Sequence, residues 1–192
     1  MSLFIEADLR ARAARGTPLH KSASVALEEH VKASATLKQF DIFLSHSFSD
    51  QALILGIMLT LEDMGYKVYV DWVHDRHLSR DSVSRETASV LRQRMMTSKS
   101  LFFATTANSS SSKWMPWELG FKDGRDGKSA ILPVVQSATN SYTGQEYLGI
   151  YPYIQKAPIQ STTVDRLWVH TSPKAYVLYE AWLEGHEPRE RT

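Results

Sequence analysis

The sequence contains no cysteine and carries almost no net charge. Without Cys the chain can form no disulfide, no thiolate zinc site and no thiol nucleophile, which suits a reducing compartment. Its 22 basic and 21 acidic residues nearly cancel. The chain as a whole therefore has no field that would attract nucleic acid or an anionic membrane, and we expect neither as a partner.

Long hydrophobic runs are also missing. The longest, residues 52–61, is about half of the ~20 residues that a bilayer-spanning helix needs, so we interpret it as a buried helix. At the amino terminus, Glu6 interrupts the chain before it can build the apolar core of a secretory signal. We therefore expect a cytoplasmic protein.

Several catalytic motifs are absent. The sequence has no Gly-x-Gly-x-x-Gly, no Walker phosphate loop, no His-Glu-x-x-His and no Gly-x-Ser-x-Gly elbow. The sequence therefore lacks the motifs that usually indicate a dehydrogenase, an NTPase, a zinc protease or an esterase. His74 and His77 could share a helical face, but Arg76 and Arg80 beside them would repel a cation. We predict no metal site and no cofactor.

The composition that remains is that of one globular domain with a short appendage, since 43% of the 192 residues are hydrophobic. Residues 1–38 show a weak helical pattern, interrupted near Gly16 and Pro18. We predict an N-terminal helical extension over 1–38, a domain over 39–185 and a C-terminal tail over 186–192. The extension is expected to be dispensable for folding.

From Phe40 onward, short apolar runs alternate with helix-length amphipathic segments, as in a parallel sheet covered by helices. The expected strands are residues 40–45, 67–71, 100–105, 130–136 and 166–170. The expected helices are 50–64, 82–97, 115–124 and 173–185, and residues 137–163 are interpreted as irregular. The predicted fold class is α/β, a doubly wound, flavodoxin-like five-stranded parallel sheet with helices on both faces.

Ligands of such sheets bind beyond the carboxyl ends of the strands. Ser45 and His46 follow the first predicted strand, and Asp71 and Trp72 follow the second. The third strand leads into Thr106 and residues 109–112. We expect these side chains to converge on one cleft.

The most informative stretch is residues 111–120, Ser-Ser-Lys-Trp-Met-Pro-Trp-Glu-Leu-Gly. One interpretation is purely structural. Pro116 could be the first residue of a helix, and Glu118 would then occupy the third position, that of a capping-box carboxylate.

Two further segments favour a functional interpretation over the structural one. They are Phe-Asp-Ile-Phe-Leu-Ser-His-Ser at 40–47 and Gly-Tyr-Lys-Val-Tyr-Val-Asp at 65–71. Together with Ser112, Trp114, Glu118 and Leu119 they resemble a Toll/interleukin-1 receptor (TIR) domain, closely over residues 38–136 and loosely beyond. The chain departs from the family pattern at Met115, where members often have Cys, and at 79–81, where Ser-Arg-Asp replaces Pro-Gly-Asp.

In the enzymatic branch of that family the glutamate matched by Glu118 is catalytic, so the resemblance implies an NAD glycohydrolase or cyclase, with NAD as substrate and a role such as antiphage defence. One carboxylate is chemically sufficient. Nicotinamide is a cationic pyridinium in NAD and leaves as a neutral amine, so it needs no general acid, unlike ordinary glycosides. A carboxylate near the ribose can stabilise the developing cation electrostatically.

The other candidate site residues have weaker support. Ser45 and His46 could contact ribose or phosphate, or only form a turn and helix start. Trp72 and Trp114 could stack on a base, although large aromatics near a sheet edge usually pack. Asp71 could orient a ribose hydroxyl or simply end its strand. Self-association is expected through the loop of residues 72–81, which contains Trp72, Arg76 and Asp81.

Two other functions stay open at this stage. A TIR module without turnover would bind partners through the same loop and use Glu118 only as a cap. A nucleoside deoxyribosyltransferase-like enzyme could use the same sheet and glutamate on a smaller nucleoside. The sequence also leaves hydrolysis and cyclisation undecided, because they differ only in what captures the ribosyl cation.

Overall fold

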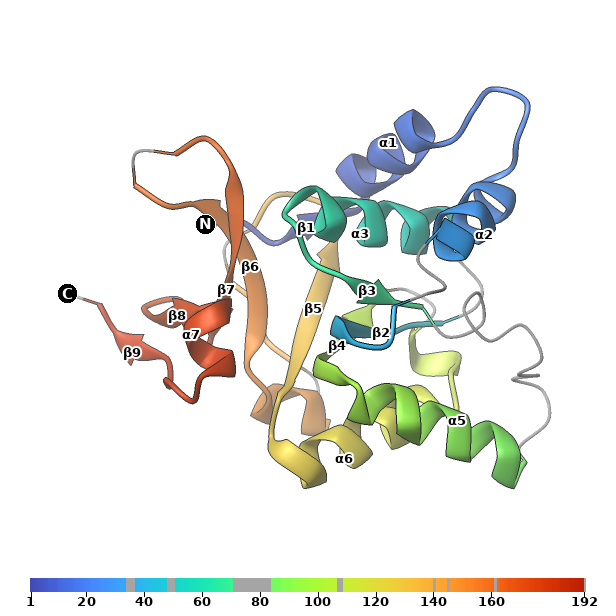
Figure 1. Ribbon diagram of the computed structural model, residues 1–192. Coiled ribbons are helices and arrows are strands. Elements are labelled where there is room, and N and C mark those ends of the chain that lie inside the picture. The colour runs from blue at the N-terminus through green and yellow to red at the C-terminus, as the bar shows by residue number, and fades with distance from the viewer. Residues whose placement is uncertain are drawn as a thin grey trace.

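A computed structural model describes residues 1–33, 37–47, 51–70, 84–106, 109–139, 141–144, 146–160 and 162–191 (Figure 1). Among these residues nine strands form one sheet in the order β3-β2-β4-β5-β6-β7-β8-β9, with β1 paired to β5. The strands are β1 (Phe4–Ile5), β2 (Phe40–Ser45), β3 (Val68–Tyr69), β4 (Ser98–Thr105), β5 (Ser129–Val135), β6 (Tyr153–Pro158), β7 (Asp165–His170), β8 (Ala175–Leu178) and β9 (Arg189–Glu190). The helices are α1 (Glu6–Gly16), α2 (Ala23–Ala33), α3 (Gln51–Asp63), α5 (Arg85–Met96), α6 (Met115–Asp126) and α7 (Tyr179–Leu183), with short 3-10 turns at Ser109–Ser111 (η1) and Glu146–Ile150 (η2).

Five neighbouring strands, β3-β2-β4-β5-β6, are parallel. Numbered by their place in the chain they run 2-1-3-4-5, the order of flavodoxin-like sheets. The predicted fold class is therefore confirmed. The chain reverses its winding direction between β2 and β4, and this is where ligands of such folds bind.

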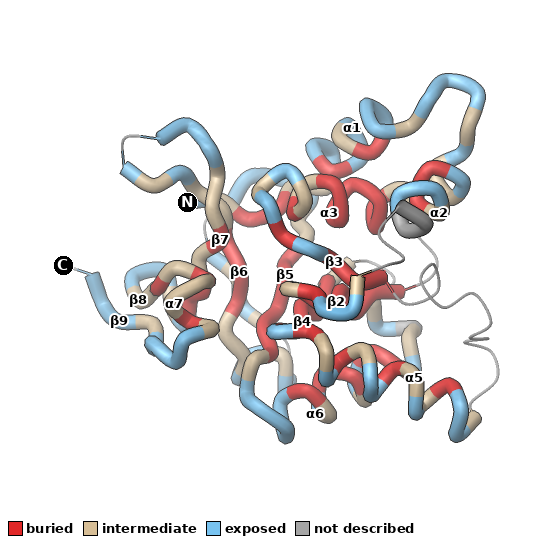
Figure 2. Tube along the Cα trace, viewed as in Figure 1, coloured by how far each residue is buried: buried red, intermediate tan, exposed pale blue. Residues whose placement is uncertain are grey.

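Side chains alternate along these strands and divide the interior into two hydrophobic layers. Ile42, Leu44 and Phe102 face α3, and Phe43 and Phe103 face α6. Helices α1, α3 and α7 cover the first layer, and α5 and α6 cover the second. Figure 2 shows the buried central strands between the two groups of helices.

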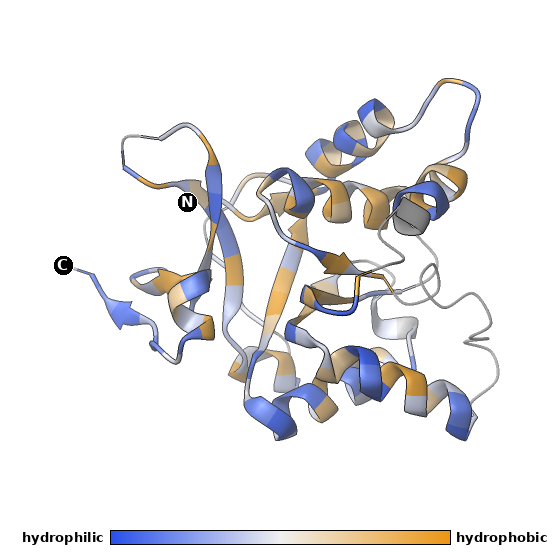
Figure 3. Cartoon of the chain, viewed as in Figure 1, coloured by the Kyte–Doolittle hydropathy of each residue, from blue (hydrophilic) through white to orange (hydrophobic). Residues whose placement is uncertain are grey.

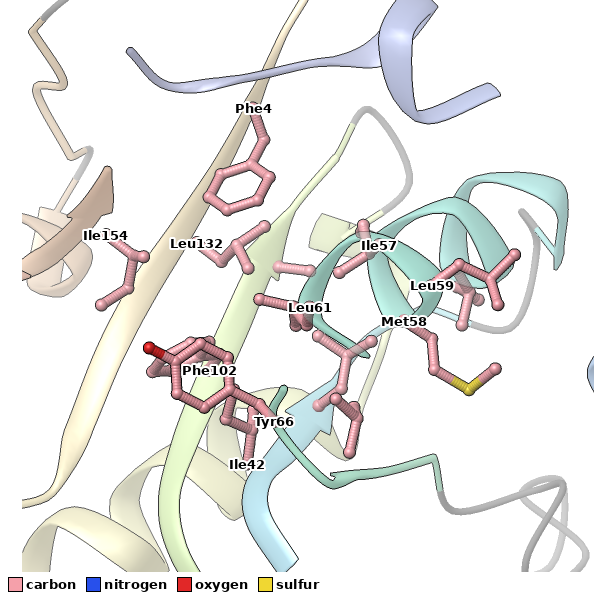
Figure 4. Packing of buried hydrophobic residues seen from close by; sticks show 14 of the residues in the cluster. Phe4, Ile42, Ile57, Met58, Leu59, Leu61, Tyr66, Phe102, Leu132 and Ile154 are labelled. Carbon is pink, nitrogen blue, oxygen red and sulfur yellow. The ribbon is translucent and has the colours of Figure 1, made fainter. Parts of the chain in front are cut away.

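The composition of helix α3 explains why the first hydrophobic layer is covered on both sides. Eight of its 13 residues are buried, in a run from Leu53 to Leu61 that leaves no polar face (Figure 3). A helix that is apolar on all sides needs cover on all sides. The sheet covers one side, as Figure 4 shows around Ile57, Leu61 and Phe102, and α1 covers the other.

The N-terminal segment packs against the sheet and α3. Strand β1 pairs in parallel with the end of β5, and Ser2 bridges to Lys156 of β6. Four large apolar side chains of the segment are buried, namely Leu3, Phe4, Leu9 and Leu27. Gly56 of α3 lies so close to α1 that an added Cβ would stand 2.1 Å from the Leu9 carbonyl oxygen. This packing speaks against the expectation that residues 1–38 are dispensable.

The C-terminal third differs most from the prediction. The fifth parallel strand is β6, inside the segment interpreted as irregular, and the strand predicted at 166–170 pairs antiparallel to it. The helix predicted at 173–185 was wrong in its first half, because residues 175–178 form β8. Ser172 accepts backbone N–H bonds from Lys174 and Ala175 at 3.3 and 3.1 Å, as a helix cap would, but here it closes the β7–β8 turn. The expected tail contributes β9, which pairs with β8.

None of the helices within the described ranges combines the length and the apolar content that crossing a membrane requires.

Candidate active site

The predicted cleft lies where the sheet changes direction. Ser45 ends β2, and its partner across the ladder is Phe103 of β4. Both side chains point to the α6 face of the sheet, since Phe43 and Phe103 belong to the same hydrophobic layer. The first turn of α6 therefore stands over the carboxyl ends of these two strands.

Glu118 and Ser45 meet at this point. The Ser45 hydroxyl donates a hydrogen bond to Glu118 Oε2 at 2.6 Å, and both residues are fully buried. Burying a carboxylate is costly unless hydrogen bonds satisfy it. A buried acidic side chain that is bonded to a strand 73 residues earlier in the chain is typical of a functional group.

The start of α6 explains how Glu118 reaches the strand. Trp114 occupies the N-cap position, the Ser112 hydroxyl accepts the N–H of Met115 at 3.3 Å, and Pro116 is the second helical residue. Glu118 is thus the fourth helical residue, one place beyond the position that a capping box requires. It still lies in the first turn, where the helix dipole favours a negative charge. Glu118 therefore does not occupy the helical position that the capping interpretation gave it.

His46 and Ser47 continue β2 and are buried. His46 Nδ1 lies 2.8 Å from the carbonyl oxygen of Leu44, and because a carbonyl only accepts, Nδ1 carries a proton. This bond fixes the orientation of the ring. A role of His46 toward substrate stays a prediction.

Trp114 packs within the protein. It is 8% exposed and meets the Trp117 ring edge-to-face at 5.4 Å, and Trp117 stacks on Phe121. This aromatic row holds the start of α6 in place, so packing is the observed role of Trp114 and its contact with a base stays a prediction. Asp71, Trp72, Arg76 and Asp81 lie outside the described residues.

A cavity of about 620 Å³ lies at the same edge of the sheet, and its lining includes Phe103, the ladder partner of Ser45, and Pro116, two residues before Glu118. It lies between the end of β4, the start of α6 and the segment around η2. Its lining residues are Phe103, Thr105, Thr106, Ser109, Ser110, Ser112, Pro116, Tyr142, Thr143, Glu146, Tyr147 and Leu148. The sequence predicted the β4 side through Thr106 and the serine run. It missed the η2 side, because residues 137–163 show no period that would place them near the sheet.

Lys122 was also missed. It follows Glu118 by one turn of α6 and is 1% exposed, with its ammonium donating to the carbonyl oxygens of Met95 and Ser98 at 3.2 and 2.6 Å and to Asp126 at 2.9 Å. Burial lowers the pKa of the Lys122 ammonium, and Asp126 partly offsets this effect. These bonds join α6 to the end of α5 and the start of β4, which sets the position of the helix that carries Glu118.

Comparison with known proteins shows to which family the chain belongs. No family model matches the chain. The chain is 47% identical over 191 residues to the probable 3′ cyclic ADP-D-ribose synthase ThsB′ of Bacillus cereus (strain MSX-D12), covering 96% of this chain and 99% of that protein. It is 36% identical over 85 residues to the putative cyclic ADP-D-ribose synthase TIR2 of Cytobacillus dafuensis, covering 44% of this chain and 22% of that protein.

The flavodoxin-like strand order and the glutamate at the start of α6 agree with the TIR resemblance of the sequence. The chain belongs to the bacterial TIR-domain family that includes ThsB′.

Proposed function

We propose that the protein cleaves the nicotinamide–ribose bond of NAD and closes the remaining ADP-ribose into a cyclic product. The observation that carries this proposal is the buried Glu118 carboxylate, held by Ser45 at the point where the sheet changes direction. The near full-length relative named as a cyclic ADP-D-ribose synthase supports cyclisation over hydrolysis.

The reaction needs few catalytic groups from the protein. When the ribosyl C–N bond breaks, its electron pair leaves on nicotinamide, which becomes neutral, and a cation develops on the ribose. Glu118 supplies the opposing charge from a preorganised position, and the Ser45 hydroxyl fixes the orientation of that charge. An atom of the same nucleotide then captures the cation and loses its proton to solvent. Water would give linear ADP-ribose instead.

Product analysis tests this proposal. The purified protein is incubated with NAD, and nicotinamide and nucleotide products are separated and weighed by mass spectrometry. We expect equal amounts of nicotinamide and a product lighter than ADP-ribose by one water. Linear ADP-ribose alone would overturn cyclisation, and absence of nicotinamide would overturn cleavage. Parallel assays with nucleosides distinguish the deoxyribosyltransferase alternative.

Self-association through residues 72–81, antiphage defence and a cytoplasmic site of action remain parts of the proposal that rest on the sequence. Specific activity should rise with protein concentration if neighbouring subunits complete the site. A constant specific activity over a wide dilution series, with one monomeric species in light scattering, would contradict self-association and leave the Glu118 chemistry untouched. That result would also remove the main support for an interaction module without turnover.

A further inference from the structure

The cavity beside Glu118 has a distinctive chemical character. Eight of the twelve described residues that line it carry hydroxyl groups, three are apolar (Phe103, Pro116 and Leu148), and the remaining one is Glu146. Lysine and arginine are absent from this described lining. Its volume falls within the ~300–1,000 Å³ typical of small-molecule sites. The lining suits a neutral ligand with many donors and acceptors and lacks the cations that would hold a phosphate.

Glu146 restricts further which class of ligand the cavity suits. A carboxylate only accepts hydrogen bonds, and one acidic side chain on the hydroxyls of a ribose is the usual arrangement in nucleotide sites. Its backbone has φ +51°, in the left-handed region that residues other than glycine seldom occupy. Such conformations are concentrated where a side chain must be aimed at a ligand. Phe103, Tyr142 and Tyr147 add aromatic surface against which a base could lie.

The position of the cavity connects it with the reaction centre. Phe103 lines it and is the ladder partner of Ser45, on a strand that lies about 4.8 Å away. Ser112 and Pro116 line it as well, and they stand at the start of the helix that carries Glu118. The cavity therefore lies at the same edge of the sheet as the Glu118–Ser45 pair, beside the first turn of α6.

We propose that this cavity is the subsite for the adenosine half of NAD. The inference rests on the proposed function, since it takes the ribose next to nicotinamide to lie at Glu118. The described part of the lining favours adenosine over the diphosphate, because it is rich in hydroxyls and contains no lysine or arginine. Binding there holds the second half of the nucleotide beside the reacting carbon, so its atoms compete with water for the ribosyl cation.

Filling the cavity tests this assignment. Thr143→Trp and Ser110→Trp place a large side chain on opposite walls, at exposed positions where the fold tolerates substitution. Thr163→Trp, at an exposed position in the β6–β7 connection, is the matched control. We expect KM for NAD to rise at least about tenfold in both cavity variants and to stay at the wild-type value in the control. The product ratio should shift toward linear ADP-ribose.

Calorimetric titration with adenosine separates this inference from the proposed function. We expect adenosine to bind the wild-type protein and the Thr163→Trp control, and to bind both cavity variants at least about tenfold more weakly. Wild-type KM and undiminished adenosine binding in two folded cavity variants would overturn the subsite, even if nicotinamide is released normally. A wild-type protein that binds adenosine but releases no nicotinamide would instead overturn the proposed reaction.

Discussion

The two faces of the sheet have different contents. On the α3 face, side chains such as Phe4, Ile57 and Leu132 form an apolar layer that α1, α3 and α7 close off, and the buried Ser100 hydroxyl in it is bonded to Tyr179 at 2.7 Å. On the α6 face, the layer is interrupted by buried polar groups, chiefly Ser45, Glu118 and Lys122. Apolar burial stabilises, whereas buried polar groups stabilise only when their bonds are all made. The comparison assigns folding stability mainly to the first face and chemistry to the second.

The strongest test of this division removes the cover of the α3 face. A chain starting at residue 38 loses Phe4, Leu9 and Leu27 from this face, and it also loses Leu3 from the α6 face. At about 1.5–3 kcal/mol for each buried side chain, their loss is worth about 6–12 kcal/mol, which matches the whole net stability of an ordinary domain. We expect this truncated protein to be unfolded by circular dichroism at 25 °C. A cooperative thermal transition near that of the full chain would restore the view of residues 1–38 as an extension.

A point substitution gives the same test without truncation. Leu9→Ala, at a position 2% exposed, should lower the free energy of unfolding by about 2–5 kcal/mol in urea titrations. Leu19→Ala is the matched control, because Leu19 is fully exposed and should change it by less than about 0.5 kcal/mol. Equal effects of the two substitutions would mean that α1 does not seal α3.

On the α6 face, Lys122→Met should lower the free energy of unfolding by about 2–4 kcal/mol. The methionine fills the space of the lysine stem but leaves two buried carbonyl oxygens, those of Met95 and Ser98, without their donor. Lys174→Met, at an exposed lysine, is the control for the loss of charge. A Lys122→Met protein as stable as the wild type would show that the buried ammonium does not hold α6.

The smallest expected effect concerns acid stability. His170 is buried between the rings of Tyr153 and Tyr176, and burial holds its pKa below the ordinary value of 6.5. At pH values between 6.5, the pKa in the unfolded chain, and the lowered pKa in the folded protein, the unfolded chain binds more protons than the folded one. The contribution of His170 to stability is therefore fully present above pH 6.5 and is lost as the pH falls toward the lowered pKa. His170→Phe should reduce the slope of unfolding free energy against pH between 7 and 5, whereas His20→Phe, at an exposed position, should not. An unchanged slope in His170→Phe would exclude His170 as its source.

The same contrast explains how much the sequence could predict. The parallel strands and the meeting of Ser45 with Glu118 follow from local apolar runs and from the rule for strand ends. Strand β6 was missed because its buried positions include Gln155 and its ends carry Pro152 and Pro158, so no apolar run marks it. The Ser172-Pro173 pair is a turn because residues 175–178 pair with β7, and that tertiary pairing overrides a local capping signal.

The role of the N-terminal segment and the η2 side of the cavity depend on long-range packing. The amphipathic pattern of α1 is weak, and only its contact with the apolar helix α3 gives it a buried face. The uniform hydrophobicity of residues 52–61 was the available signal, because such a helix needs cover on both sides. Lys122 resembles any surface lysine in sequence, and its burial follows from carbonyl oxygens contributed by α5 and β4.

The most direct test of the central claim measures activity and stability together in one variant from each face. Glu118→Gln keeps the side-chain shape and removes the charge, and Leu59→Ala opens a cavity in α3 at a buried position. We expect Glu118→Gln to release nicotinamide from NAD at least about a hundredfold more slowly while its free energy of unfolding changes by less than about 1 kcal/mol. Leu59→Ala should lose about 2–5 kcal/mol of stability and keep most of its turnover. Wild-type turnover in a folded Glu118→Gln protein would contradict the assignment of the chemistry to Glu118.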